Sequence, residues 1–98
     1  MANTRPYEVT FVVRPDLDEA GLTGVIDKVK GWITASGGSV TKTDLWGRRR
    51  LAYPLKKMTE GQYVLVLANL PAQSLAGLER DLRLSEEILR FLLIRVDE

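Results

Sequence analysis

The chain contains neither cysteine nor histidine, and these two absences exclude much catalytic chemistry. Without cysteine, its 98 residues can form no disulfide, no thiolate nucleophile and no cysteine-bound metal site. Without histidine, they also lack the commonest general base and metal ligand. An enzyme is therefore the weaker class, and we expect no metal and no cofactor.

Long apolar runs are also missing. No stretch approaches the roughly 20 apolar residues that span a bilayer, and residues 1–5 lack the apolar run of a signal peptide. The hydrophobic content of 45% is nevertheless enough for one core. These features predict a single soluble, cytoplasmic domain over residues 1–98 with no membrane partner.

Positive charge is scarce overall but concentrated in one stretch. The net charge is only +1, yet residues 42–57 carry Lys42, Arg48, Arg49, Arg50, Lys56 and Lys57 against a single acidic residue, Asp44. Arginine forks match phosphate oxygens and stack on bases, so three arginines between Trp46 and Tyr53 indicate an RNA contact. A charged edge strand that resists aggregation is an equally good interpretation. Strict alternation would place Trp46, Arg48 and Arg50 on one side and Gly47, Arg49 and Leu51 on the other.

Apolar periodicity divides the chain into strands and helices. Residues 7–13 alternate apolar and polar side chains, as a strand with one buried face does. A helical apolar pattern follows, between possible N-caps at Asp16 and Asp18 and a stop at Gly37. The remaining predicted elements are a strand at 39–53 with a bulge or bend at Gly47, a charged connection at 54–60 with its turn at Gly61, a strand at 62–70, a short helix whose first turn holds Pro71, and a strand at 88–96.

This βαββαβ order predicts an α+β, ferredoxin-like fold. Right-handed crossovers give a four-stranded antiparallel sheet of order 4-1-3-2 with both helices on one face. The basic second strand and the apolar fourth strand then lie at opposite edges. Val12, Leu92 and Ile94 fall on the uncovered face with Arg90, which suggests a docking surface for another protein. Alternatively, the 54–60 connection covers this face, or the face self-associates.

Four segments of the chain resemble the family of ribosomal protein six of the bacterial small subunit. They are WGRRRLAYPLK at 46–56, GQY at 61–63, YEV at 7–9 and LRFL at 89–92. Together with the order of elements, the resemblance covers essentially the whole chain. It implies a cytoplasmic, ribosome-bound protein without catalytic activity.

The resemblance also implies two partners. These are the central domain of small-subunit ribosomal RNA and ribosomal protein eighteen, with which the family forms a heterodimer. No small-molecule substrate is implied. The expected RNA contacts are Arg5, Arg48, Arg49, Arg50, Tyr53, Lys56 and Arg90, and the expected protein contacts are Val12, Leu92 and Ile94.

Other classes fit the sequence less well. A generic RNA-recognition motif shares the order of elements, but Glu60 precedes Gly61 and residues 64–66 supply no aromatic ring. An acylphosphatase-like enzyme would need a phosphate-cradling loop after the first strand, where Pro15 removes a backbone donor. A homo-oligomer that buries its own open face is the third alternative.

Overall fold

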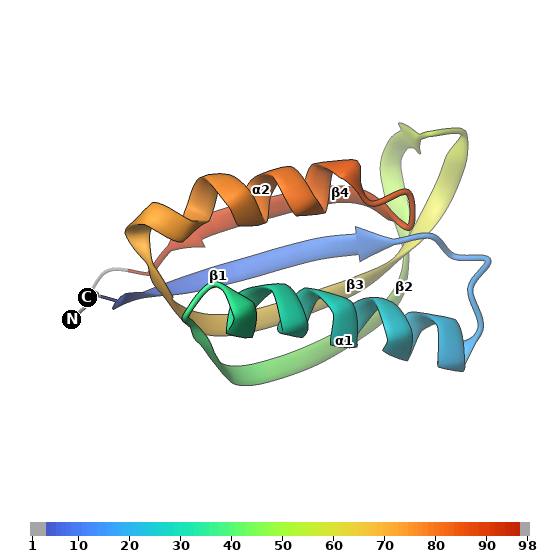
Figure 1. Cartoon of the computed structure of the whole chain (residues 1–98). Coiled ribbons are helices and arrows are strands. Elements are labelled where there is room, and N and C mark those ends of the chain that lie inside the picture. Colours follow the sequence, from blue (N-terminus) through green and yellow to red (C-terminus); the bar gives the residue numbers. More distant parts are fainter. Residues whose placement is uncertain (1–3, 97–98) are drawn as a thin grey trace.

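The four strands and two helices follow the predicted βαββαβ order. The structure, a computed structural model, describes residues 4–96. Its sheet has the strand order β2-β3-β1-β4 with every pair antiparallel, which confirms the predicted topology. Both helices cover one face of this sheet (Figure 1). The elements are β1 (Thr4–Val13), α1 (Glu19–Ala35), β2 (Ser39–Leu55), β3 (Met58–Pro71), the 3-10 turn η1 (Ala72–Ser74), α2 (Leu75–Leu84) and β4 (Ile88–Arg95).

The core lies between the helices and one face of the sheet. Odd-numbered residues of β1 and even-numbered residues of β3 point into it, because successive side chains alternate across a strand. Each large apolar side chain buried there contributes roughly 1.5–3 kcal/mol. Fully buried members are Val9, Phe11, Val13, Val29, Ile33, Val64, Val66, Leu70, Leu78 and Leu82.

Helix α1 begins at one of the two predicted caps. Asp18 is the N-cap, and its Oδ1 accepts a hydrogen bond of 2.8 Å from the backbone N–H of Gly21. Asp16 instead forms an ion pair with Arg14 at 3.1 Å. The helix ends before Gly37, whose φ of +91° suits glycine and confirms the predicted stop.

The connection between β2 and β3 differs from the prediction. The strands continue to Leu55 and resume at Met58, so residues 54–60 are mostly strand and Gly61 is not a turn. The turn consists of Lys56 and Lys57, with φ of +49° and +69°, as in a two-residue type I′ hairpin. Lysine gives no local signal for such a turn, which is why the pattern pointed to the nearest glycine.

Gly61 is needed for close packing within the sheet. A Cβ built at this position would collide with Cγ1 of Val12, whereas its next neighbours stand at ordinary contact distances of 3.6 and 3.7 Å.

The start of the second helix was also predicted wrongly. Pro71 pairs with Thr4 at the end of β3 and has an extended backbone, so α2 begins only at Leu75.

Candidate RNA and protein interface

A bulge in β2 rearranges the basic stretch. The pairing between β2 and β3 shifts register between Leu45 and Gly47, and Gly47 has a φ of +87°, which confirms the predicted bulge. The ring of Trp46 consequently stacks on Tyr63, and the guanidinium of Arg49 lies 5.3 Å from the centre of the Trp46 ring. Trp46 and Arg49 therefore share a side, and the expected strict alternation is wrong. The extra residue of the bulge shifts the order of faces by one position.

Arg48 and Arg50 lie on the other side of the hairpin. They pair across the ladder with Gln62 and Glu60, and cross-strand partners project to the same face. Nη2 of Arg48 donates a 2.8 Å hydrogen bond to the carbonyl of Pro15, and Nη1 stands 3.9 Å from Glu60. Arg48 thus ties the hairpin to the loop before α1, while Arg50 is exposed.

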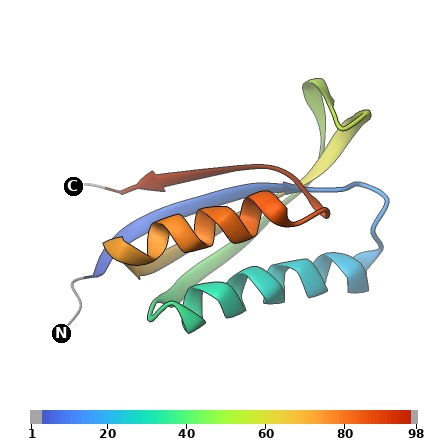
Figure 2. The same cartoon turned by 45° about the horizontal axis from the view of Figure 1, so that its top comes forward.

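The tip of the β2–β3 hairpin extends away from the helices and toward β4 (Figure 2). Nη1 of Arg90 donates a 3.0 Å hydrogen bond to Oη of Tyr53. This bond links strands at opposite edges of the sheet, so the structure brings two of the predicted RNA contacts together. Lys56 joins them, because it lines a hollow of about 280 Å³ with Arg90 and Arg83.

The sheet face opposite the helices, which we call the open face, carries the predicted protein contacts. Leu92 and Ile94 are 52% and 44% exposed there, as expected. Half-buried Leu65 and Leu67 of β3 extend the apolar surface. These side chains make an apolar area beside the cations of the hairpin.

Val12 differs from the other two predicted protein contacts. It pairs with Arg90 and Tyr63 on the open face, but only 5% of it is exposed. Gly61 packs directly against it. Gly61, which lies outside the 54–60 connection that was expected to cover this face, therefore packs over Val12, while Leu92 and Ile94 remain exposed.

Arg5 lies apart from the other candidate RNA contacts. It is exposed at the start of β1 and pairs with Leu70, whereas the hairpin projects from the opposite end of the sheet (Figure 1). An extended strand places Arg5 about 23 Å from Val12. A ligand that touches both Arg5 and the hairpin must span the sheet lengthwise.

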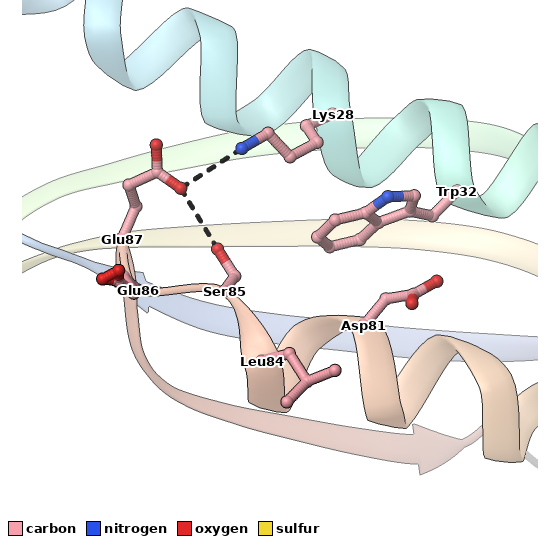
Figure 3. A pocket seen from close by; sticks show the side chains of 7 residues that line it. All are labelled: Lys28, Trp32, Asp81, Leu84, Ser85, Glu86 and Glu87. Atoms are coloured by element: carbon pink, nitrogen blue, oxygen red, sulfur yellow. Dashed lines mark hydrogen bonds and ion pairs between the residues drawn. The ribbon is translucent and has the colours of Figure 1, made fainter.

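The charged side chains that line a hollow between the two helices are mainly acidic. The volume of this hollow is about 450 Å³. Trp32 of α1 and Asp81 of α2 are among the side chains that line it (Figure 3). Glu86 and Glu87 line the same hollow, and Lys28 is the one cation among the described residues around it. Nζ of Lys28 donates to Oε1 of Glu87 at 3.2 Å, and this hydrogen bond is the main cause that lowers the pKa of Glu87. Such a surface disfavours phosphate.

Among residues 4–96 no group of three or more acidic side chains could hold a metal ion. None of the helices in this range is long and apolar enough to cross a membrane.

Sequence reasoning left two aromatic residues out of the predicted site. Trp46 is 44% exposed beside Arg49, and Tyr63 is half-buried beneath it. Trp46 had been noted only as a neighbour of the arginines. Gly47 was the signal in the sequence that could have identified Trp46, because a bulge at Gly47 turns the indole toward Arg49.

The fold and the two adjoining surfaces define a small, ferredoxin-like binding protein. The family model for ribosomal protein S6 matches residues 6–95. The chain therefore belongs to the ribosomal protein S6 family. It is a structural constituent of the small ribosomal subunit and not an enzyme.

Relatives and solved structures agree with this assignment. The small ribosomal subunit protein bS6 of Moorella thermoacetica is 45% identical over 96% of both chains. The corresponding protein of Carboxydothermus hydrogenoformans is 42% identical, with 96% of this chain and 98% of that protein covered. The crystal structure of 30S ribosomal protein S6 from Thermotoga maritima is 30% identical, with a TM-score of 0.89 over 96% of this chain and 89% of that chain.

A more distant structure shares the fold alone. The P2 domain of the chemotaxis kinase CheA, solved in complex with CheY from Thermotoga maritima, has a TM-score of 0.65 and is 14% identical. The match covers 96% of this chain and the whole of that one. The same fold therefore carries unrelated functions, and the particular surface residues must decide what each member binds.

Proposed function

We propose that this chain binds the central domain of small-subunit ribosomal RNA together with ribosomal protein eighteen, as a ribosome-bound protein of the cytoplasm. The observation that carries the proposal is the position of the cationic hairpin beside the exposed apolar side chains of the open face. RNA would contact the hairpin, and the partner protein would cover Leu92 and Ile94. Family membership supports both assignments.

The proposed RNA contacts have unequal roles. Arg49, Arg50 and Lys56 present exposed cations on the hairpin, where they can neutralise phosphates. Tyr53 and Arg90 hold each other, so they present a preformed pair of donors. Arg48 contributes mainly by holding the hairpin against Pro15, and Arg5 contacts RNA only where the ligand reaches the far end of the sheet.

Each partner should bind this chain more tightly when the other partner is present. The net charge of +1 gives no general attraction to RNA, so affinity depends on local contacts. When the partner protein covers the apolar area, both partners present one combined surface to the RNA, and each binding event strengthens the other. Alone, the chain should bind the RNA weakly.

Salt dependence tests the electrostatic part of this proposal. If the hairpin neutralises about four to six phosphates, log Kd should rise with log salt at a slope of about 0.7–0.9 per phosphate. Replacing Arg49 or Arg50 with alanine should lower the slope by about one contact each and weaken binding by about 1–3 kcal/mol. Leu92→Asp should weaken binding of protein eighteen even when RNA is absent.

The experiment is a titration of a central-domain RNA fragment with the chain, with and without protein eighteen, at several salt concentrations. Arg80→Ala is a matched control, because Arg80 is exposed on α2, away from the hairpin. The proposal requires that Arg49→Ala bind more weakly than Arg80→Ala and that the partner increase affinity. Equal affinity of both variants, or no effect of the partner, contradicts it. Concentration-dependent sedimentation of the chain alone would then test self-association through the open face.

A further inference from the structure

Trp46 does not belong to the buried core. Its side chain is 44% exposed at the edge strand β2. The ring is nearly parallel to that of Tyr63, with an interplanar angle of 10° and a centroid separation of 6.4 Å. At this separation the two rings are offset and do not cover each other completely. Part of the indole therefore remains accessible beside the basic hairpin.

The surroundings of this ring are cationic. The guanidinium of Arg49 lies 5.3 Å from the centre of the Trp46 ring, within the range of a cation–π interaction. Arg50 lies on the opposite face of the hairpin, where it pairs with Glu60. An exposed indole beside one arginine offers a base a surface for stacking and offers its phosphate a positive charge.

The local backbone holds the indole in this position. The bulge at Gly47, with its positive φ, places Trp46 over Tyr63. A Cβ at Gly47 would meet no atom within 4 Å, so the glycine serves the backbone conformation and not close packing. The platform is thus preformed before any ligand binds, and this reduces the entropic cost of stacking.

From these observations we infer that Trp46, with Arg49 and Tyr63, forms a stacking site for one unpaired base of an RNA. The inference rests on the proposed function, and it adds the class of nucleotide and the residues that hold it.

A protein contact is the competing interpretation, and the distances favour RNA. Leu92 and Ile94, the apolar residues exposed on β4, lie at the other edge of the sheet. Three strand spacings separate β2 from β4, about 14 Å. A protein that covers Leu92 and Ile94 of β4 therefore leaves room for a base stacked on Trp46. The cations cluster at the Trp46 edge, where an apolar protein surface would have to desolvate them.

The test combines protein variants with abasic RNA. Affinity of the central-domain fragment is measured in the presence of protein eighteen for the parent chain, Trp46→Leu and Trp46→Phe. Each unpaired nucleotide of the fragment is replaced in turn by an abasic one. Trp46→Leu should weaken binding by about 5- to 100-fold, and Trp46→Phe should retain most of the affinity. One abasic position should weaken binding to the parent by a similar factor and leave binding to Trp46→Leu unchanged.

Fluorescence supplies an independent readout. In a Trp32→Phe background, Trp46 is the only tryptophan, and stacking of a base should quench its emission. Quenching should disappear with the same abasic RNA. An unfolding curve for each variant verifies that Trp46→Leu remains folded under the binding conditions.

The outcomes separate this inference from the proposed function. If the RNA binds with the expected salt dependence but no abasic position and no Trp46 substitution matters, the stacking site is wrong and the proposed function stands. If Trp46→Leu weakens protein eighteen binding without RNA as strongly as it weakens the complex, Trp46 is a protein contact and the inference is overturned. If the parent does not bind RNA even with protein eighteen, the proposed function itself fails.

Discussion

Gly61→Ala should destabilise the sheet through one identifiable collision. The added Cβ would overlap Cγ1 of Val12, while the nearest other atoms, the carbonyl oxygen of Val13 and Cδ2 of Leu51, stand at 3.6 and 3.7 Å. Val12 cannot easily move away, because its branched side chain is stiff at χ1 and its backbone is hydrogen-bonded in β1 between two strands. The substitution therefore forces strain into the centre of the sheet.

The expected loss of stability in Gly61→Ala can be worked out from substitutions that overpack the cores of other proteins. Inserting a methyl group into a filled site costs about 1–3 kcal/mol, and the smaller entropy of the unfolded alanine chain offsets about 0.4–1 kcal/mol of this. The net destabilisation should be about 1–2 kcal/mol. For a chain of this size that corresponds to a fall in Tm of about 4–16 °C.

The double variant Gly61→Ala/Val12→Ala tests the cause. Val12→Ala alone should lower the free energy of unfolding by about 1.6 kcal/mol, because it removes two buried methyl groups, and the cavity that it leaves should lower it further. In the double variant the methyl group added at position 61 fills part of that cavity. Equilibrium urea unfolding, followed by circular dichroism, should therefore show a double variant that is less destabilised than the sum of the single ones by at least about 0.5 kcal/mol.

Gly24→Ala is the matched control, because it changes the same atoms at an exposed position of α1 where a Cβ meets nothing within 4 Å. It should stabilise the chain by up to about 1 kcal/mol. The reasoning is refuted if Gly61→Ala is as stable as the parent, or if the Gly61 and Val12 effects simply add. Because Gly61 pairs with Arg49, a true collision should also displace Arg49 and weaken RNA binding.

Three further substitutions test the turn, an ion pair and a helix cap. Lys57→Gly should stabilise the chain by about 1 kcal/mol in urea unfolding, because lysine at a φ of +69° is strained; a loss of stability would contradict the type I′ turn. Glu87→Gln should lower stability by up to about 1 kcal/mol at neutral pH, since Lys28 lowers the pKa of Glu87. A lowered pKa stabilises the fold above the unfolded value, so the difference from the parent should shrink once the pH falls below the usual glutamate range and should vanish below the lowered pKa of Glu87. A difference that persists at pH 2 would exclude this ion pair as its cause. Asp18→Ala should cost about 0.5–2 kcal/mol by removing the acceptor for the N–H of Gly21, whereas Asp16→Ala should cost less.

The elements and their order could be read from the sequence because they depend on local periodicity. Alternation in residues 7–13 and the helical spacing from Leu22 to Ile33 each encode a buried face, and the structure buries those residues. Right-handed crossovers then leave one sheet order for a βαββαβ chain. The concentration of arginines between Trp46 and Tyr53 is likewise a property of composition, as is the family motif.

The arrangement of the site was decided by tertiary structure. The bulge at Gly47 depends on how β2 pairs with β3, and it moved Trp46 to the side of Arg49. The Lys56-Lys57 turn has no local signature, because hairpin pairing imposes the positive φ values. Periodicity gives the face of a residue only until an extra residue shifts it, and it contains no information on strand twist or bending.

Contacts between residues far apart in the sequence account for the remaining differences between the predicted and the observed site. Tyr53 and Arg90 belong to opposite edges of the sheet, yet the bent hairpin brings them within 3.0 Å. The close approach of Gly61 to Val12 belongs to the same sheet packing, and Val12 is buried although its strand position lies on the open face. The sequence by itself determined which side chains were available for binding and which way the strands run. Only the tertiary structure decided which of those side chains meet, because that depends on pairing and curvature across the whole sheet.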